Sequence, residues 1–251
     1  MEKYYTVNAE GCSIRCKLYA GELPPERVIL YGHGFGGHKD NKAAEHFALR
    51  LLEKNRRAAL VCFDWPCHGE DVRKVLRLED CDRYLRLVLE DIHSRFAPVR
   101  LDAYATSFGG YLFLKWISEH GSPFARIALR CPAVCMYKVL CTAVLTEENL
   151  RLLERGKSVP AGFDRKIAVD RVFLESLRDA DLTQRDFLPW ADDVLILHGK
   201  EDEIVPIEDV KRFAEENVID FIPVEGADHR FQNPKAMELA SKEILRFLEL
   251  K

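Results

Sequence analysis

The chain has 251 residues, of which 47% are hydrophobic, enough for one large α/β domain or two small ones. Its formal net charge of −4 gives no general attraction to nucleic acid or to anionic membranes, so a small neutral or weakly charged substrate is the default expectation. No apolar run approaches bilayer length, and the opening residues MEKYYTVNAEG lack the apolar core of a signal peptide. These features predict a cytoplasmic protein with no nucleic-acid partner and no integral membrane association.

The chain alternates short apolar runs with helical patterns. YYTVNA and SIRCKLYA predict an opening hairpin around Glu10 and Gly11. Strands are then predicted at 28–31, 57–64, 99–105, 125–131, 193–199 and 218–224, and helices at 42–55, 81–96, 109–119 and 206–216. A last helix begins with Asn233 as N-cap and Pro234 in its first position. Continuous apolar strands that alternate with helices predict an α/β protein whose mostly parallel central sheet is covered on both faces.

One segment breaks this alternation. Between residues 132 and 191 no sheet strand is predicted, whereas TEENLRLLERG and DRVFLESLRDADL predict two helices joined by a polar turn around SVPAGFD. A connection of that length inside a compact domain is usually functional or a small separate lid. We therefore expect a core made of residues 1–131 and 192–251, with 132–191 as a helical cap over the carboxyl edge of the sheet.

The cysteine and histidine patterns do not favour a metal site. None of the eight cysteines belongs to a CxxC pair, and several lie in apolar runs, which is typical of reduced thiols in a core. His33, His68 and His198 follow predicted strands, but each lies in an HG dipeptide and no HxH or HExxH spacing is present. We expect these histidines to shape loops, and we expect no metal and no organic cofactor.

A serine lies at a tight break between a predicted strand and a predicted helix. In YATSFGG, small residues flank Ser107, which lets the strand and the helix approach closely and directs the hydroxyl outward above the sheet. A hydroxyl nucleophile needs a base, and that base needs an acid to orient it. Asp202 follows the strand LILH and His229 follows the strand FIPV, so both lie in loops at strand ends. We predict Ser107, His229 and Asp202 as nucleophile, base and acid.

Five motifs in this order resemble the α/β-hydrolase superfamily from Val28 to the C-terminus. HGFGG resembles the oxyanion loop, DWPCHGE the DxPGHGxS loop, ATSFG the GxSxG nucleophile elbow, HGKEDEIVP the acid loop, and GADHRF the histidine loop. With a cap after the sixth strand, the chain is similar to bacterial carboxylesterases, cinnamoyl esterases, monoglyceride lipases and serine aminopeptidase-like hydrolases. The chain departs from the family pattern where Ala105 replaces the first elbow glycine and Cys67 replaces the glycine of DxPGHG.

The resemblance implies further site residues. The backbone amides of Phe35 and Phe108 would form the oxyanion hole, and Phe108 also lies at a helix N-terminus, where the dipole favours negative charge. Phe35 and Trp65 are candidates for the floor of an acyl pocket, although aromatic residues beside sheet ends are also ordinary packing. We expect the thiol of Cys67 on the substrate side.

The predicted function is therefore a serine hydrolase that cleaves small to medium carboxylic esters. Lysophospholipase, monoglyceride lipase, thioesterase, acyltransferase and aminopeptidase share the same apparatus, because substrate choice lies in the cap. A peptidase would need a carboxylate to hold the substrate amine, for which Glu147, Glu148, Glu154 and Asp164 are candidates. A non-catalytic ligand-binding protein of the same fold is the alternative of another class. The oligomeric state is left open, with a homodimer as one alternative.

Overall fold

The computed structural model describes residues 1–97 and 99–249 and contains a central sheet of eight strands in the order β1-β2-β4-β3-β5-β6-β9-β10. The strands are β1 (Glu2–Ala9), β2 (Cys12–Ala20), β3 (Arg27–Gly32), β4 (Ala58–Phe63), β5 (Arg100–Thr106), β6 (Ile127–Arg130), β9 (Val194–Gly199) and β10 (Asp220–Val224). β1 and β2 form the predicted hairpin, β2 pairs antiparallel with β4, and every later pairing is parallel. The prediction of a mostly parallel central sheet is confirmed.

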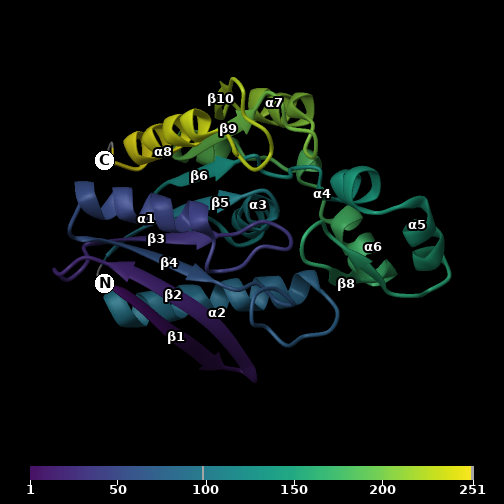
Figure 1. Cartoon of the computed structure of the whole chain (residues 1–251), viewed down its shortest axis with the longest axis horizontal. Helices are drawn as coiled ribbons and strands as arrows, with labels where there is room; N and C mark the ends of the chain where they lie inside the picture. The colour runs from purple at the N-terminus through teal and green to yellow at the C-terminus, as the bar shows by residue number, and fades with distance from the viewer. Residues whose placement is uncertain (98, 250–251) are drawn as a thin grey trace.

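Helices cover both faces of the sheet (Figure 1). One face carries α1 (Lys42–Lys54) and α8 (Pro234–Glu249), and the other carries α2 (Leu78–Phe96), α3 (Phe108–His120) and α7 (Ile207–Glu216). The apolar residues of α1 recur three and four positions apart and are buried: Ala44, Phe47, Ala48 and Leu51. Because helices cover both faces, all six residues of β4 are buried, which explains its uninterrupted apolar sequence.

The predicted helix boundaries agree with the structure to within a few residues. Asn233 caps α8, since its side-chain oxygen accepts a hydrogen bond from the amide of Lys235 at 3.0 Å. Thr146 and Asn149 form a reciprocal capping box at the start of α5 (Glu147–Glu154). Local signals of this kind need only neighbouring residues, so the sequence was sufficient to locate them.

The segment between β6 and β9 lies to one side of the sheet, at the right in Figure 1. Its elements are α4 (Met136–Val139), a π-helical turn (Leu140–Val144), α5, β7 (Val159–Ala161), β8 (Ile167–Val169), α6 (Arg171–Asp179) and 3₁₀ turns at Leu182–Gln184 and Leu188–Asp193. β7 and β8 form a separate antiparallel pair, with Val159 opposite Val169. The two predicted helices are present as α5 and α6, but the turn predicted between them contains β7 and β8. The prediction of a segment without strands was therefore wrong, because three-residue strands are too short to show a period.

Within the described residues, no helix combines the length and the apolarity that crossing a bilayer requires. All eight cysteines are free thiols, and six of them are buried.

Candidate active site

Ser107 lies at the turn between β5 and α3 with a strained backbone (φ 50°, ψ −116°). A non-glycine residue rarely adopts a positive φ, and such strain is typically found where a side chain must be held in a functional position. The close approach that this turn requires is visible at Gly109, where a Cβ would lie 2.4 Å from the carbonyl oxygen of Gly32. Ala105, which replaces a family glycine, is fully buried and is accommodated beside Gly32 in the neighbouring strand.

Asp202 lies in the loop after β9, and its buried carboxylate accepts hydrogen bonds on both oxygens. Oδ1 accepts hydrogen bonds from the amides of Ile204 (2.9 Å) and Val205 (2.8 Å). Oδ2 accepts a hydrogen bond from Nδ1 of His229 (2.7 Å) and lies 3.2 Å from Nε2 of His198. The carboxylate is thus held in one orientation by backbone and side-chain donors together.

His229 joins Asp202 to Ser107. Its Nε2 lies 3.0 Å from the hydroxyl oxygen of Ser107, while its Nδ1 faces Asp202. Because the carboxylate can only accept, Nδ1 carries the proton and Nε2 is free to accept the proton of Ser107. The structure thus brings together the three side chains that the sequence places 95 and 27 positions apart, in loops after β5, β9 and β10.

The pKa of Asp202 is set by two opposing effects. Burial favours the neutral acid and raises the pKa, whereas hydrogen bonds from His198, His229 and the amide of Val205 stabilise the carboxylate and lower it. The effect of the hydrogen bonds is the larger one, so the pKa of Asp202 lies well below its usual range. The carboxylate therefore stays ionised wherever the fold persists, and it can stabilise a positive charge on His229.

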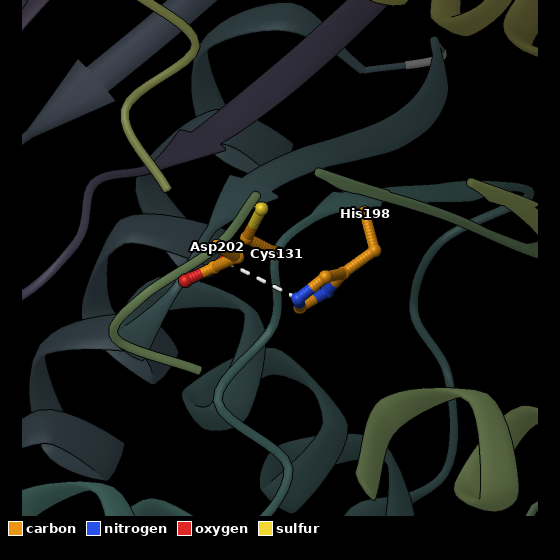
Figure 2. A group of neighbouring side chains, drawn as sticks. All are labelled: Cys131, His198 and Asp202. Atoms are coloured by element: carbon orange, nitrogen blue, oxygen red, sulfur yellow. Dashed lines mark ion pairs between the residues drawn. The ribbon is translucent and has the colours of Figure 1, made fainter. Parts of the chain in front are cut away.

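Cys131 and His198 lie beside the carboxylate of Asp202, as Figure 2 shows. The three potential ligand atoms lie within 4.8 Å of one another, a spacing that could hold a metal ion. However, burial raises the pKa of the Cys131 thiol well above its usual value, its thiol hydrogen-bonds to Asp202, and Nε2 of His198 donates to the carbonyl of Val205 at 3.0 Å. The donor set therefore fits a hydrogen-bonded cage around the carboxylate better than a thiolate metal site.

Cys131 is a neighbour of Asp202 that no pattern in the sequence indicates. Cys131 directly follows β6, and Asp202 follows β9, which pairs with β6 in the sheet. Only the strand order brings them together, so no spacing in the sequence could have indicated this contact.

The loop after β3 lies against Ser107, since a Cβ on Gly34, the residue before Phe35, would lie 3.2 Å from the Cβ of Ser107. The amide of Gly37 donates to the carbonyl of Gly34 at 3.0 Å, and Nδ1 of His33 donates to the same oxygen at 2.8 Å. The ring of Phe35 packs edge-on against Phe108, with centroids 5.5 Å apart. Phe108 directly follows Ser107 and is the first residue of α3, so its amide has no acceptor within the helix.

The loop after β4, in which Cys67 replaces a family glycine, contacts the loop after β3 through Asp64 and Lys39. Asp64 accepts the amide of Lys39 at 2.7 Å and the amide of Glu70 at 3.0 Å, and the Lys39 ammonium forms ion pairs with both acids. Cys67 keeps the positive φ (67°) that a glycine would adopt there, and it is buried in the core. The expectation of a thiol on the substrate side was wrong, since this backbone turn directs Cys67 inward.

A cavity of about 500 Å³ opens above Ser107. Its walls include Phe35, His229 and the apolar side chains of Met136, Val139 and Val144. Trp65 does not line it: the indole is fully buried, donates to the carbonyl of His33 at 3.1 Å, and packs on Phe63 with centroids 4.4 Å apart. The assignment of Trp65 to the acyl pocket is therefore corrected, because the indole needs its hydrogen-bond acceptor inside the core.

The connection between β7 and β8 contacts three loops of the site. The guanidinium of Arg165 donates to the carbonyl of Gly69 at 2.6 Å, and Asp164 pairs with Arg230 at 2.7 Å, one residue after His229. Gly162 lies against the ring of Phe35. Residues 162–165 therefore close one side of the cavity by direct contact.

Comparisons with known proteins agree with this fold. A model of the alpha/beta hydrolase family matches residues 28–240, and the chain belongs to that family. The chain is also 28% identical over 144 residues to monoacylglycerol lipase abhd6-B of Xenopus laevis, a match that covers 56% of this chain and 40% of that protein. It therefore spans less than half the length of that curated relative.

Solved structures show the same architecture over nearly the whole chain. Est1E from Butyrivibrio proteoclasticus with ferulic acid bound superposes with a TM-score of 0.74 at 18% identity, covering 97% of each chain. A putative hydrolase from Agrobacterium vitis S4 superposes with a TM-score of 0.77 at 17% identity, covering 99% of each chain. At these identities the likeness establishes the fold, and the chemistry must be argued from the site.

Proposed function

We propose that this protein is a serine hydrolase that cleaves carboxylic esters of small to medium size. The observation that carries the proposal is the chain of contacts from Ser107 Oγ to His229 Nε2 (3.0 Å) and from His229 Nδ1 to Asp202 Oδ2 (2.7 Å). Such a chain converts a weakly nucleophilic hydroxyl into an effective nucleophile, because the base is positioned and its charged form is stabilised.

In the proposed cycle, His229 takes the proton of Ser107 as the oxygen attacks the ester carbonyl. Asp202 stabilises the imidazolium ion that forms. His229 then donates that proton to the leaving alkoxide, which departs as the alcohol and leaves an acyl group on Ser107. A water molecule, deprotonated by His229, hydrolyses the acyl-enzyme and restores the serine. Every step uses side chains of this chain and water.

The tetrahedral intermediates carry a negative charge that needs hydrogen-bond donors. We assign that role to the amides of Phe35, in the loop after β3, and of Phe108, the first residue of α3. Phe108 begins a helix of 13 residues, whose dipole adds a partial positive charge at this end. Loss of one such donor typically lowers turnover about 100- to 1000-fold.

The proposed substrate size follows from the cavity. A volume of about 500 Å³ lies within the range of small-molecule pockets, and its apolar walls suit an acyl chain. In this proposal residues 132–191 act as the cap, because α4 and the following turn supply Met136, Val139 and Val144 to those walls. The free and mostly buried cysteines support the expectation of a reducing compartment.

A lipase that acts on monoacylglycerols is the alternative favoured by the sequence similarity to the frog monoacylglycerol lipase.

The residues that line the cavity give less support to an aminopeptidase. Asp164 is the cap acid that lines it, and this acid is paired with Arg230. Glu147, Glu148 and Glu154 belong to α5, away from the cavity lining.

Labelling with a fluorophosphonate probe tests the proposal against a non-catalytic binding protein. Only an activated serine reacts with this probe, so we expect mass spectrometry to find the adduct on Ser107 in the native protein. The protein unfolded in urea is the control and should remain unlabelled. A native protein that stays unlabelled at Ser107 would overturn the proposed function.

A further inference from the structure

The active-site cavity carries an excess of positive charge. Its charged walls are three arginines, Arg130, Arg165 and Arg230, and one acid, Asp164. Arg230 and Asp164 pair with each other, with the closest atoms 2.7 Å apart. Arg130 and Arg165 line the same cavity and form no ion pair with a carboxylate among the described residues, in a protein whose formal net charge is −4.

Arg130 is the more unusual of the two. It ends β6 beside Ser107, whose amide donates to the carbonyl of Arg130 at 3.0 Å, and it is only 5% exposed. Its Nη1 contacts the sulfur of Met237 at 3.1 Å, and its guanidinium lies over the ring of Phe231, 5.1 Å from the centroid. Its Nε has no hydrogen-bond partner among the described residues.

These contacts compensate a buried charge poorly. A thioether is a weak acceptor, and burial of a cation without a paired anion leaves its loss of hydration uncompensated. Asp228 acts on Arg130 electrostatically without forming an ion pair, and its Oδ1 already accepts the amide of Gln232. Arginine is the residue best suited to bind carboxylate or phosphate oxygens, so an unpaired one in a cavity wall has a chemical use.

The cavity that Arg130 lines also includes the N-terminal end of α1. Asn41 and Ala43 line it, and Asn41 caps this helix of 13 residues by accepting hydrogen bonds from the amides of Ala43 and Ala44. The helix dipole adds a partial positive charge at this end. Arg165 adds a second cation, which donates to the backbone carbonyls of Gly69 and Cys67.

We propose that the substrate is an ester that carries an anionic group, a carboxylate or a phosphate, which binds Arg130 while the ester carbonyl reaches Ser107. This inference rests on the proposed function and deepens it by naming the substrate class. Arg130 is a binding residue in this account, because the anion lies away from the reacting bond. Its contribution should then be seen in KM more than in kcat.

The test compares two esters that differ in one charge. Mono-p-nitrophenyl adipate ends in a free carboxylate, and p-nitrophenyl methyl adipate ends in its neutral methyl ester. For the wild-type protein we expect kcat/KM to be roughly 10- to 100-fold higher for the anionic ester, the range of a hydrogen-bonded charge contact. Equal values for the two esters, with Ser107-dependent turnover of both, would overturn this inference and leave the proposed function intact. Absence of Ser107-dependent turnover of either ester would overturn both.

Variants separate binding from structure. In Arg130→Met we expect the ratio of kcat/KM for the anionic ester to kcat/KM for the neutral ester to fall to about one, through a higher KM for the anionic ester. We also expect its melting temperature to be equal or higher, because an apolar side chain of similar volume removes the uncompensated charge. Arg130→Lys should keep part of the preference. The control is Arg171→Gln in α6, where an exposed arginine is paired with Glu175 and should leave the preference unchanged.

A measurement on the wild-type protein keeps the test independent of folding. Adipate and glycerol 3-phosphate are added separately to the neutral-ester assay, and competitive inhibition by either supports the inference and tells carboxylate from phosphate. Inhibition by neither, or an Arg130→Met protein that loses both esters equally and melts at a lower temperature, would overturn it.

Discussion

Nε2 of His198 lies 3.2 Å from Oδ2 of Asp202, the same oxygen that accepts a hydrogen bond from Nδ1 of His229. The ring of His198 is fully buried, and its Nε2 also donates to the carbonyl of Val205 at 3.0 Å. His198 does not line the cavity above Ser107, so we propose that it acts as a positioning residue for the acid of the proposed triad.

The first prediction concerns this contact. His198→Leu removes one donor to Asp202, so we expect kcat to fall about tenfold with little change in KM, the loss of one charged hydrogen bond. His198→Gln keeps an amide donor and should recover part of the activity. The pH profile of kcat is the decisive measurement. A carboxylate that has lost one donor stabilises a positive charge on His229 more strongly, so the acid limb should move to higher pH. Identical profiles for the wild type and His198→Leu would contradict the positioning role.

The second prediction concerns the elbow. In Gly109→Ala the new methyl group would lie 2.4 Å from the carbonyl oxygen of Gly32, so strand and helix must separate. We expect the free energy of unfolding to fall by about 2 to 3 kcal/mol and esterase activity to be lost as Ser107 moves. Chemical denaturation and ester turnover provide the two measurements.

Gly156→Ala is the matched control for that variant. Gly156 has φ +73° and no atom near the position of a Cβ, so only backbone strain of about 1 kcal/mol is expected, with full activity. If Gly109→Ala were no less stable and no less active than this control, the close approach at the elbow would not matter.

The third prediction concerns pH and stability. Burial lowers the pKa of His33 to about 3 and that of His68 to about 3, whereas both rise to about 6.5 in the unfolded chain. Between these pKa values the unfolded state binds more protons than the folded state. The contribution of the two neutral histidines to the free energy of unfolding is therefore fully present above pH 6.5 and is lost as the pH falls toward 3. We expect a loss of about 1 to 2 kcal/mol per histidine between pH 7 and pH 5, measured by urea denaturation.

A histidine variant isolates this effect. In His68→Gln about one proton fewer should be taken up on unfolding, so the free energy of unfolding should depend less steeply on pH, whatever the effect on absolute stability. His93→Gln, at an exposed position in α2, should leave the slope unchanged. Equal slopes in the two variants would show that His68 does not cause the pH dependence.

The fourth prediction separates the backbone of Phe35 from its side chain. The amide is the proposed oxyanion donor, while the ring packs on Phe108 and lies 5.5 Å from the ring of His68. Phe35→Leu keeps the amide and much of the volume, so we expect kcat to fall less than about tenfold, against the 100- to 1000-fold typical for loss of a donor. A loss from Phe35→Leu as large as that from Ser107→Ala would contradict the assignment of the backbone.

The fold and the three central side chains could be predicted because their signals are local. A serine between a strand and a helix, an aspartate after LILH and a histidine after FIPV each mark the end of a strand. Parallel strands place such ends along one edge of the sheet, so the motifs meet without further information. The capped helices after Thr146 and Asp170 were visible for the same reason.

The remaining features depend on the direction of side chains and on strand order. Trp65 follows a strand end like the site residues, yet its indole points into the core to reach the carbonyl of His33. Cys131 meets Asp202 only because β6 lies beside β9. Arg130 shows no sign of burial in the sequence, since arginine is usually exposed. These contacts come from tertiary packing, which neither spacing nor composition records.

The central claim is that Ser107 is the nucleophile of an ester hydrolase. The most direct test is hydrolysis of p-nitrophenyl esters from acetate to palmitate by the wild type and by Ser107→Ala, with melting curves to show that both proteins are folded. We predict a rate on short and medium acyl chains that falls at least 1000-fold in Ser107→Ala. A folded Ser107→Ala protein that kept the wild-type rate would contradict the account.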